Sequence, residues 1–147
     1  MKGTDKYIFN AIIIISLIIS VFVFNESFNS YSDIITFLSI MIGFEITSLS
    51  ILYNSPLRNT LYYRKISYYK TELHRLKDFY KHALFFEVLS ILFLFIVPEK
   101  IFYVQIMGNN ICIGRYILVL PILLGTIYCF YKIVNDLLKI FVHPTNN

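Results

Sequence analysis

Charged residues are scarce in this chain. Only 15% of its 147 residues are Asp, Glu, Lys or Arg, while 57% are hydrophobic. An average soluble domain has about a quarter of charged residues, so the composition excludes an ordinary soluble fold. The length leaves room for one domain. The sequence therefore predicts a single-domain integral membrane protein.

Cysteine, histidine and glycine are also few, and their placement excludes several kinds of site. Cys112 and Cys129 lie too far apart along a helix for a disulfide, so we expect two free thiols. His74, His82 and His143 are scattered, and the chain has no metal-ligand spacing, glycine-rich phosphate loop or nucleophile elbow. We expect no catalytic residue, no metal site and no cofactor.

Long apolar stretches are what the sequence does contain. A helix that spans a bilayer needs about 20 mostly apolar residues. Four stretches approach this length: Tyr7–Phe24, Ile34–Tyr53, Ala83–Val97 and Tyr116–Val134. The predicted fold class is all-α, a polytopic membrane protein with four transmembrane helices in one domain, residues 1–147.

The positions of the cations indicate the orientation. With the N-terminus inside, eleven of the thirteen Lys and Arg residues face the cytoplasm, and only Lys100 and Arg115 lie outside. No small-x-small cleavage site follows the first apolar core, so this segment is expected to stay as an anchor. We predict a bacterial inner membrane protein with both termini cytoplasmic. An external apolar run with a turn signal at Gly108-Asn109 predicts a small hairpin at the outer membrane boundary.

The one long polar interval is Ser55–His82, which carries seven of the thirteen Lys and Arg residues. Ser55 before Pro56 fits an N-cap followed by a proline in the first helical turn. We predict a basic amphipathic helix of about residues 56–82, roughly 40 Å long, that continues unbroken into the third span. Its apolar residues recur at alternating spacings of four and three, which favours packing against another helix. This apolar stripe is Tyr62, Ile66, Tyr69, Leu73, Leu76, Tyr80 and Ala83.

Three lysines and a histidine form a row beside the apolar stripe. Such a row can lie on anionic lipid headgroups or dock an acidic cytoplasmic protein, at about 1 kcal/mol per cation near the surface. Alternatively, these charges only set the topology. Because the stripe also needs a partner surface, we favour self-association or a second protein, with no direct contact to nucleic acid. The candidate partner-binding residues are Tyr69, Lys70, Leu73, His74, Leu76, Lys77 and Lys81.

Two glutamates lie inside apolar segments. Glu45 is placed near mid-bilayer, where a charge costs on the order of 2.5–3.5 kcal/mol. It is either a proton- or cation-sensing carboxyl that lines a cavity between helices, or a structural group hydrogen-bonded to Ser48 or to a neighbouring helix. Glu87 is placed one turn inside the cytoplasmic boundary, where it could snorkel to the interface or pair with Lys81 or His82.

Small residues mark two expected close contacts. Ser39, Gly43 and Thr47 follow one another at four-residue spacing and allow close helix approach. Such a row more often packs within a chain than between subunits, although a chain this small has few faces and oligomers are common. Pro121 and Gly125 predict a bend and a close contact in the fourth span.

The runs TFLSIMIGF (residues 36–44) and SLSILYNSP (48–56), followed by a basic helix and a third span, resemble small four-span membrane subunits of bacterial phage-defence systems. The chain is most similar to the Kiwa membrane subunits (KwaA), and its layout is also similar to the phage exclusion protein RexB. A Kiwa-like subunit implies a homo-oligomer, such as a tetramer, that responds to phage attack and works with a DNA-binding cytoplasmic effector like KwaB. RexB-like kinship implies a cation-conducting channel.

The sequence thus leads to a non-enzymatic sensor and scaffold of an antiphage system, surrounded by membrane lipids, which oligomerises and recruits a cytoplasmic effector. An oligomeric pore with Glu45 in a ring along a cation pathway is the alternative. A small proton-coupled transporter is a third possibility, but it would require an aromatic cavity, and the neighbours of Glu45 are mainly aliphatic.

Overall fold

The protein is described by a computed structural model that covers residues 3–23, 29–66, 68–99, 102–106 and 109–142. Within these ranges, side chains are described except at positions 23, 102–113 and 139–142.

Four long helices make up most of the chain. They are α1 (Thr4–Val23), α2 (Tyr31–Asn54), α4 (Glu72–Ile96) and α5 (Val119–Val142). The short helix α3 (Leu57–Tyr63) follows α2, and the 3-10 segment η1 (Arg115–Leu118) leads into α5. A helix of 24 residues, such as α2, is about 36 Å long, which exceeds a hydrocarbon core of about 30 Å. Within the described residues, four helices are long and apolar enough to cross a membrane, and this part of the prediction is confirmed.

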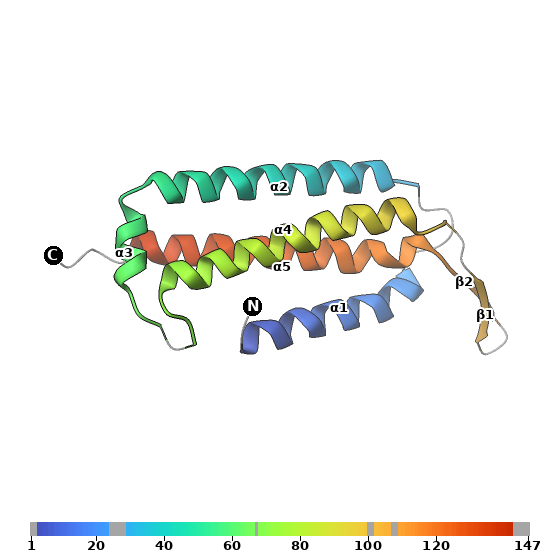
Figure 1. Cartoon of the computed structure of the whole chain (residues 1–147). Coiled ribbons are helices and arrows are strands. Elements are labelled where there is room, and N and C mark those ends of the chain that lie inside the picture. The colour runs from blue at the N-terminus through green and yellow to red at the C-terminus, as the bar shows by residue number, and fades with distance from the viewer. Residues whose placement is uncertain (1–2, 24–28, 67, 100–101, 107–108, 143–147) are drawn as a thin grey trace.

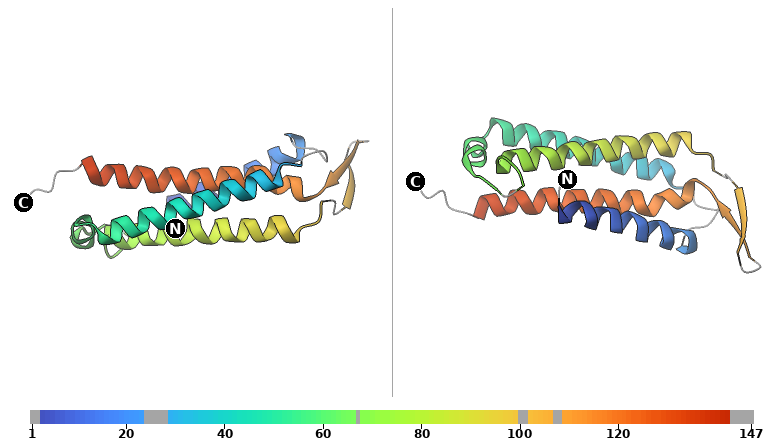
Figure 2. Two further views of the ribbon diagram at one scale, coloured as in Figure 1. Left: turned by 90° about the horizontal axis from the view of Figure 1, so that it is seen from above. Right: turned by 60° about the horizontal axis from the view of Figure 1, so that its bottom comes forward.

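The four helices form an up-and-down bundle (Figure 1). The adjacent helices α4 and α5 lie in its middle; α1 packs mainly on α5, and α2 on α4. The views in Figure 2 show the same lengthwise arrangement from two other sides. One end of the bundle holds α3 and the last turns of α5, and we call it the α3 end. The opposite end, which carries the two strands, is the hairpin end.

The outside of the bundle is apolar, as a helix in lipid requires. Large hydrophobic side chains face outward along its length, among them Ile18 (58% exposed), Ile40 (64%) and Phe95 (67%). A soluble monomer rarely leaves so much contiguous apolar surface in water. The chain is therefore a membrane protein.

A two-stranded antiparallel hairpin connects α4 to η1. Strand β1 (Phe102–Ile106) pairs with β2 (Asn109–Ile113), with Phe102 opposite Ile113 and Ile106 opposite Asn109. The predicted hairpin is confirmed as a pair of strands, while Gly108 of the predicted turn lies outside the described residues. Nearby, Arg115 holds the hairpin end together: its Nε donates to the Val97 carbonyl over 2.7 Å, and its guanidinium lies 5.1 Å from the Tyr31 ring centroid.

The prediction of an unbroken basic helix over residues 56–82 is wrong. Helix α3 ends at Tyr63, the described residues between the two helices (64–66 and 68–71) are not helical, and α4 starts at Glu72, eleven residues before the predicted third span. The start near Pro56 is close to the observed one, but Ser55 does not cap α3; its hydroxyl donates to the Leu52 carbonyl at 2.9 Å.

Local chemistry explains the break. Tyr68 has a φ of 77°, a left-handed conformation that cannot continue a helix. Thr71 then caps α4, because its side chain accepts a hydrogen bond from the His74 backbone N–H at 3.3 Å. The Glu72 N–H donates to the Arg64 carbonyl at 2.9 Å and closes the loop.

An ion-pair network fixes this loop to the bundle. Glu72 pairs with Arg64 at 3.3 Å and with Arg75 at 3.8 Å, and Arg75 also reaches the Asp136 carboxylate on α5 at 2.9 Å. Because Glu72 and Asp136 are both buried, the shared arginine offsets two charges that would otherwise be costly. The network joins the loop, α4 and α5.

The α4 part of the apolar stripe packs inside the bundle, whereas Tyr62 on α3 is 53% exposed. Leu76 (2% exposed), Tyr80 (1%) and Ala83 (0%) belong to an apolar cluster at the α3 end that also takes residues from α2, α3 and α5, and Leu73 packs against it. A second cluster occupies the hairpin end and includes Leu38 and residues of α4 and α5. For this α4 part of the stripe, the chain's own bundle supplies the packing surface.

Two special residues of α5 have different roles. Pro121 is the third residue of α5, where its missing N–H would have no partner within the helix, so it suits a helix start and produces no bend in the helix interior. Gly125 provides the predicted close contact: a Cβ there would lie 2.6 Å from the Phe86 ring and 3.0 Å from Ile13.

Candidate functional site

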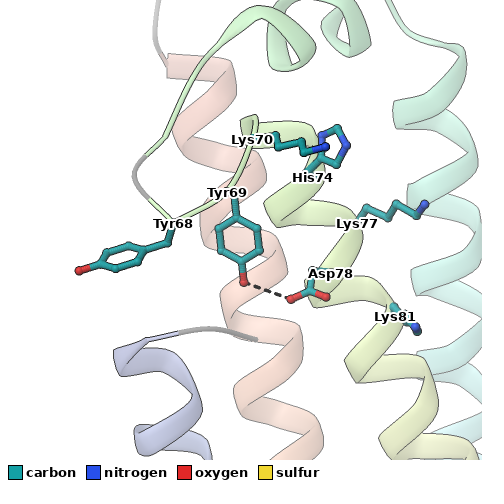
Figure 3. Close-up of a pocket in the computed structure, with 7 residues that line it drawn as sticks. All are labelled: Tyr68, Tyr69, Lys70, His74, Lys77, Asp78 and Lys81. Carbon is teal, nitrogen blue, oxygen red and sulfur yellow. Dashed lines mark hydrogen bonds between the residues drawn. The ribbon is translucent and has the colours of Figure 1, made fainter.

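A row of cations lines an open pocket at the α3 end (Figure 3). The pocket has a volume of about 410 Å³. Its residues come from the loop before α4 and from the first three turns of α4. We call it the cationic pocket; it is lined by Tyr68, Tyr69, Lys70, His74, Lys77, Asp78 and Lys81.

The lysines of the pocket are free to bind an anion. Lys70, Lys77 and Lys81 are exposed, and none of them forms an ion pair within the part of the chain that the structure describes. The pocket's one carboxylate, Asp78, already accepts a hydrogen bond from the Tyr69 hydroxyl at 3.1 Å and pairs with His82 at 3.6 Å. The unmatched charge of the pocket is therefore positive.

The N-terminal cap of α4 orients the His74 side chain. The His74 Nδ1 lies 2.7 Å from the Thr71 hydroxyl, so the cap that starts α4 also fixes this imidazole. In Figure 3 the Lys70 side chain reaches toward His74, and Lys77 and Lys81 follow along α4. His74, Lys77 and Lys81 share one face of α4 by their spacing of three and four residues, and Lys70 lies beside them in the preceding loop.

Only part of the predicted partner-binding set comes together here. The four basic residues share the pocket, and Tyr69 lines it. Leu76 is instead buried in the apolar cluster at the α3 end, and Leu73 is partly buried against the same cluster. Tyr68 was not predicted; it lines the pocket and is 82% exposed. The only sequence signal for Tyr68 was its position beside Tyr69 and Lys70.

A second polar feature lies in the centre of the bundle. On each of α2, α4 and α5, three buried residues follow at heptad spacing, which places them on one face. The outer two are large and mainly apolar, and the middle one is polar. These triplets are Leu38, Glu45 and Leu52; Tyr80, Glu87 and Leu94; and Val119, Thr126 and Ile133. We call the three middle residues, Glu45, Glu87 and Thr126, the polar layer.

Every side-chain oxygen of the polar layer is unpaired among the described residues. Glu45, Glu87 and Thr126 are each 0% exposed, and none of their side-chain oxygens has a hydrogen-bond partner. Ser48 does not bond to the Glu45 carboxyl as proposed; its hydroxyl donates to the Glu45 backbone carbonyl at 3.0 Å and lies 2.8 Å from the Tyr80 hydroxyl.

Glu87 also differs from its expected environment. It neither snorkels to the surface nor pairs with Lys81 or His82, since Lys81 is exposed and His82 pairs with Asp78. Instead, the carboxyls of Glu45 and Glu87 are close enough to interact electrostatically with each other.

The thiol of Cys129, one turn from Thr126 on α5, interacts electrostatically with both carboxyls of the layer. Cys129 is a buried free thiol, as expected, whereas the side chain of Cys112 is outside the described set. Among the residues covered by the structure, no group of three or more His, Cys, Asp or Glu side chains could hold a metal ion.

The small-residue row of α2 faces outward. Ser39, Gly43 and Thr47 are all exposed, and a Cβ on Gly43 would meet nothing within 4 Å. The hydroxyls of Ser39 and Thr47 donate to carbonyls of their own helix, each at 2.8 Å. The row therefore does not pack within the chain, and its hydroxyls are satisfied at the lipid-facing surface.

Comparison of the chain with protein-family models, with curated proteins and with solved structures finds no match.

Proposed function

We propose that this protein is a non-enzymatic scaffold of the bacterial inner membrane that holds an acidic partner protein at its α3 end. The observation that carries the proposal is the cationic pocket, in which exposed Lys70, Lys77 and Lys81 have no carboxylate partner among the described residues. Among the described residues no group of three or more His, Cys, Asp or Glu side chains could hold a metal ion, and the pocket offers clustered positive charge beside two tyrosines. Such a surface suits an acidic segment with aromatic or aliphatic side chains.

The sequence supplies the orientation and context for this proposal. The positive-inside rule places the α3 end in the cytoplasm, where a soluble effector can reach it. The resemblance to Kiwa-type membrane subunits supports a role in antiphage defence with an effector of this kind. In that role, a perturbed envelope would shift the helices between two arrangements, and the loop before α4 would pass the change to the pocket.

The outward row Ser39, Gly43 and Thr47 is the surface that we propose for self-association in such a scaffold. The open space over Gly43 allows the backbone of a second copy to approach closely. A homo-oligomer would also multiply the cationic pockets and raise the effective concentration of sites for a multivalent partner.

Pull-down of the intact protein from its native cells tests the scaffold. The variant Lys77→Glu/Lys81→Glu reverses two pocket charges, and we expect it to lose the partner that the wild type recovers. Each exposed ion pair contributes about 0.2–1 kcal/mol, and reversal adds repulsion of similar size. The two reversals together therefore weaken binding by about 0.8–4 kcal/mol, and we expect at least about fourfold weaker recovery.

The matched control is Lys6→Glu/Lys65→Glu, which makes the same change of charge at exposed residues outside the pocket. It should keep the partner, and both variants should insert into the membrane like the wild type. Equal recovery by the two variants would show that the pocket does not hold the partner. In phage plating assays, the pocket variant alone should abolish any protection that the wild type provides.

A cation pathway through the bundle is the second candidate, and the buried Glu45 carboxyl favours it. Because Glu45 is buried within one chain and interacts with Glu87 on α4 and Cys129 on α5, such a pathway would run through each chain rather than along a ring of glutamates between chains. Overexpression of the wild type should then depolarise cells, and Glu45→Gln should reduce this effect. If Glu45→Gln depolarises cells as strongly as the wild type, the carboxyl is not part of a filter.

A further inference from the structure

The polar layer is sealed from water at both ends by apolar clusters. On α2, Glu45 lies seven residues from Leu38 in the hairpin-end cluster and seven from Leu52 in the α3-end cluster, about 10 Å in each direction. Glu87 on α4 lies in the same way between the two clusters. The two carboxyls are therefore at the centre of the bundle, with a hydrophobic plug above and below.

Two ionised carboxylates cannot be stable in such a layer. Each would lose its hydration, and each would repel the other, while all four oxygens are without hydrogen-bond donors among the described residues. A proton on one of the two carboxyls removes one charge and with it their mutual repulsion. We propose that Glu45 and Glu87 form an occluded proton-binding site, which can exchange its proton only when one of the apolar clusters opens.

The neighbours of the pair suit a proton better than a metal ion. From α5, the Cys129 thiol interacts electrostatically with both carboxyls, and from α4, the Tyr80 hydroxyl interacts with Glu45. The helix α1 contributes Phe9 and Ile13 near this level, and neither can titrate. No cation pairs with either carboxyl in the described ranges, and no metal-ligand group is found there. This site does not depend on the scaffold function proposed above.

Infrared spectroscopy of the full chain in liposomes tests the site. Asp and Glu in water titrate near pH 4, so at about pH 7.5 exposed carboxyls are ionised and lack the C=O band of a carboxylic acid. We expect this band in the wild type and its loss in Glu45→Gln/Glu87→Gln. The control Asp33→Asn/Glu99→Gln removes two exposed carboxyls and should keep the band. Gln has nearly the shape of Glu, and thermal unfolding of both variants checks that they fold.

Three results would show that the pair does not hold a proton. The first is a wild-type spectrum without the band, and the second is a band of unchanged area in the double Gln variant. The third is a band that disappears in NaCl but not in choline chloride, since the site would then take Na⁺.

Transfer to D₂O tests the occlusion. The band should shift slowly in the wild type and at least several-fold faster in Leu38→Ala, but not in Ile40→Ala on the outer face. A shift complete on mixing would exclude a sealed site.

Discussion

Replacing Gly125 by alanine should destabilise the bundle, although alanine is the better helix former. The new Cβ would lie 2.6 Å from the Phe86 Cζ and 3.0 Å from the Ile13 Cδ1. Ordinary carbon contacts are about 3.5–4.0 Å, so the Phe86 ring would have to retreat by roughly 1 Å. The ring also makes an edge contact with Phe9, at 5.2 Å between centroids, so its retreat disturbs α1 as well.

The outward Gly43 provides a matched comparison for the size of this effect. Gly43→Ala gains the same helix propensity, up to about 1 kcal/mol, but its Cβ meets nothing within 4 Å. The propensity gain cancels between the two variants, and the difference is the overpacking cost of about 1–3 kcal/mol. At roughly 2–4 °C per kcal/mol for a chain of this size, Gly125→Ala should melt several degrees below Gly43→Ala.

The buried thiol of Cys129 reports the melting directly. In a Cys112→Ala background, Cys129 is the only cysteine, and it is 1% exposed. In dilute detergent solution, a dye that fluoresces on reaction with a thiol will therefore label Cys129 only as the bundle unfolds. Phe86→Leu should restore part of the stability that Gly125→Ala removes. Equal melting temperatures for the two alanine variants, or no rescue by Phe86→Leu, would refute the tight packing of α1, α4 and α5 at Gly125.

Three further predictions use the same unfolding assay or a simple cross-link. Tyr80→Phe and Ser48→Ala should each lower the free energy of unfolding by about 1 kcal/mol. The double variant should lower it little more than either, because each substitution removes the same 2.8 Å hydrogen bond. Additive losses would contradict this hydrogen bond. Arg75→Met should lower the free energy of unfolding by about 2 kcal/mol, because it leaves the buried Asp136 carboxylate without its arginine. Adding Asp136→Asn to this variant should recover part of the loss, and no recovery would argue against the 2.9 Å ion pair. Gly43→Cys should form a disulfide between copies in membranes if the small-residue row is an interface, and its absence under oxidation would exclude close contact there.

The sequence was sufficient for the features that depend on composition and short-range pattern. The four spans follow from apolar length alone, and the hairpin follows from the turn signal between two apolar runs. The close contact at Gly125 was also predicted, because a small residue in a long apolar helix has few other uses. These features require no knowledge of how distant segments pack.

The break before α4 was missed because an apolar stripe at heptad spacing does not distinguish a helix from a helix interrupted by a short loop. Thr71 followed by Glu72 is a sequence signal for a helix N-cap, and it indicated a new helix start at this position. The missed break also misplaced Glu87. Measured from Ala83 it seemed to lie one turn inside the membrane, whereas it is the sixteenth of the 25 residues of α4 and lies near the middle.

The polar layer required the tertiary structure. Glu45, Glu87 and Thr126 are on three different helices. They lie at the same level only when these helices pack side by side in the observed register. The heptad triplets around them were present in the sequence, but nothing in the sequence states which triplet lies beside which. The sequence predicted part of the cationic pocket, because helical spacing grouped its lysines. It did not predict that Tyr68 lines the pocket, because this position depends on the left-handed backbone conformation of Tyr68 itself.

The most direct test of the whole account is the reaction of single cysteines with a membrane-impermeant maleimide, in a background without native cysteines. Ser30→Cys at the hairpin end should react in intact cells, and Lys77→Cys in the cationic pocket should react only after permeabilisation. Ile40→Cys is 64% exposed in the bundle but faces lipid, so it should stay unreactive in both. Labelling of Lys77→Cys in intact cells would contradict the cytoplasmic position of the pocket, and ready labelling of Ile40→Cys would contradict the membrane-spanning bundle itself.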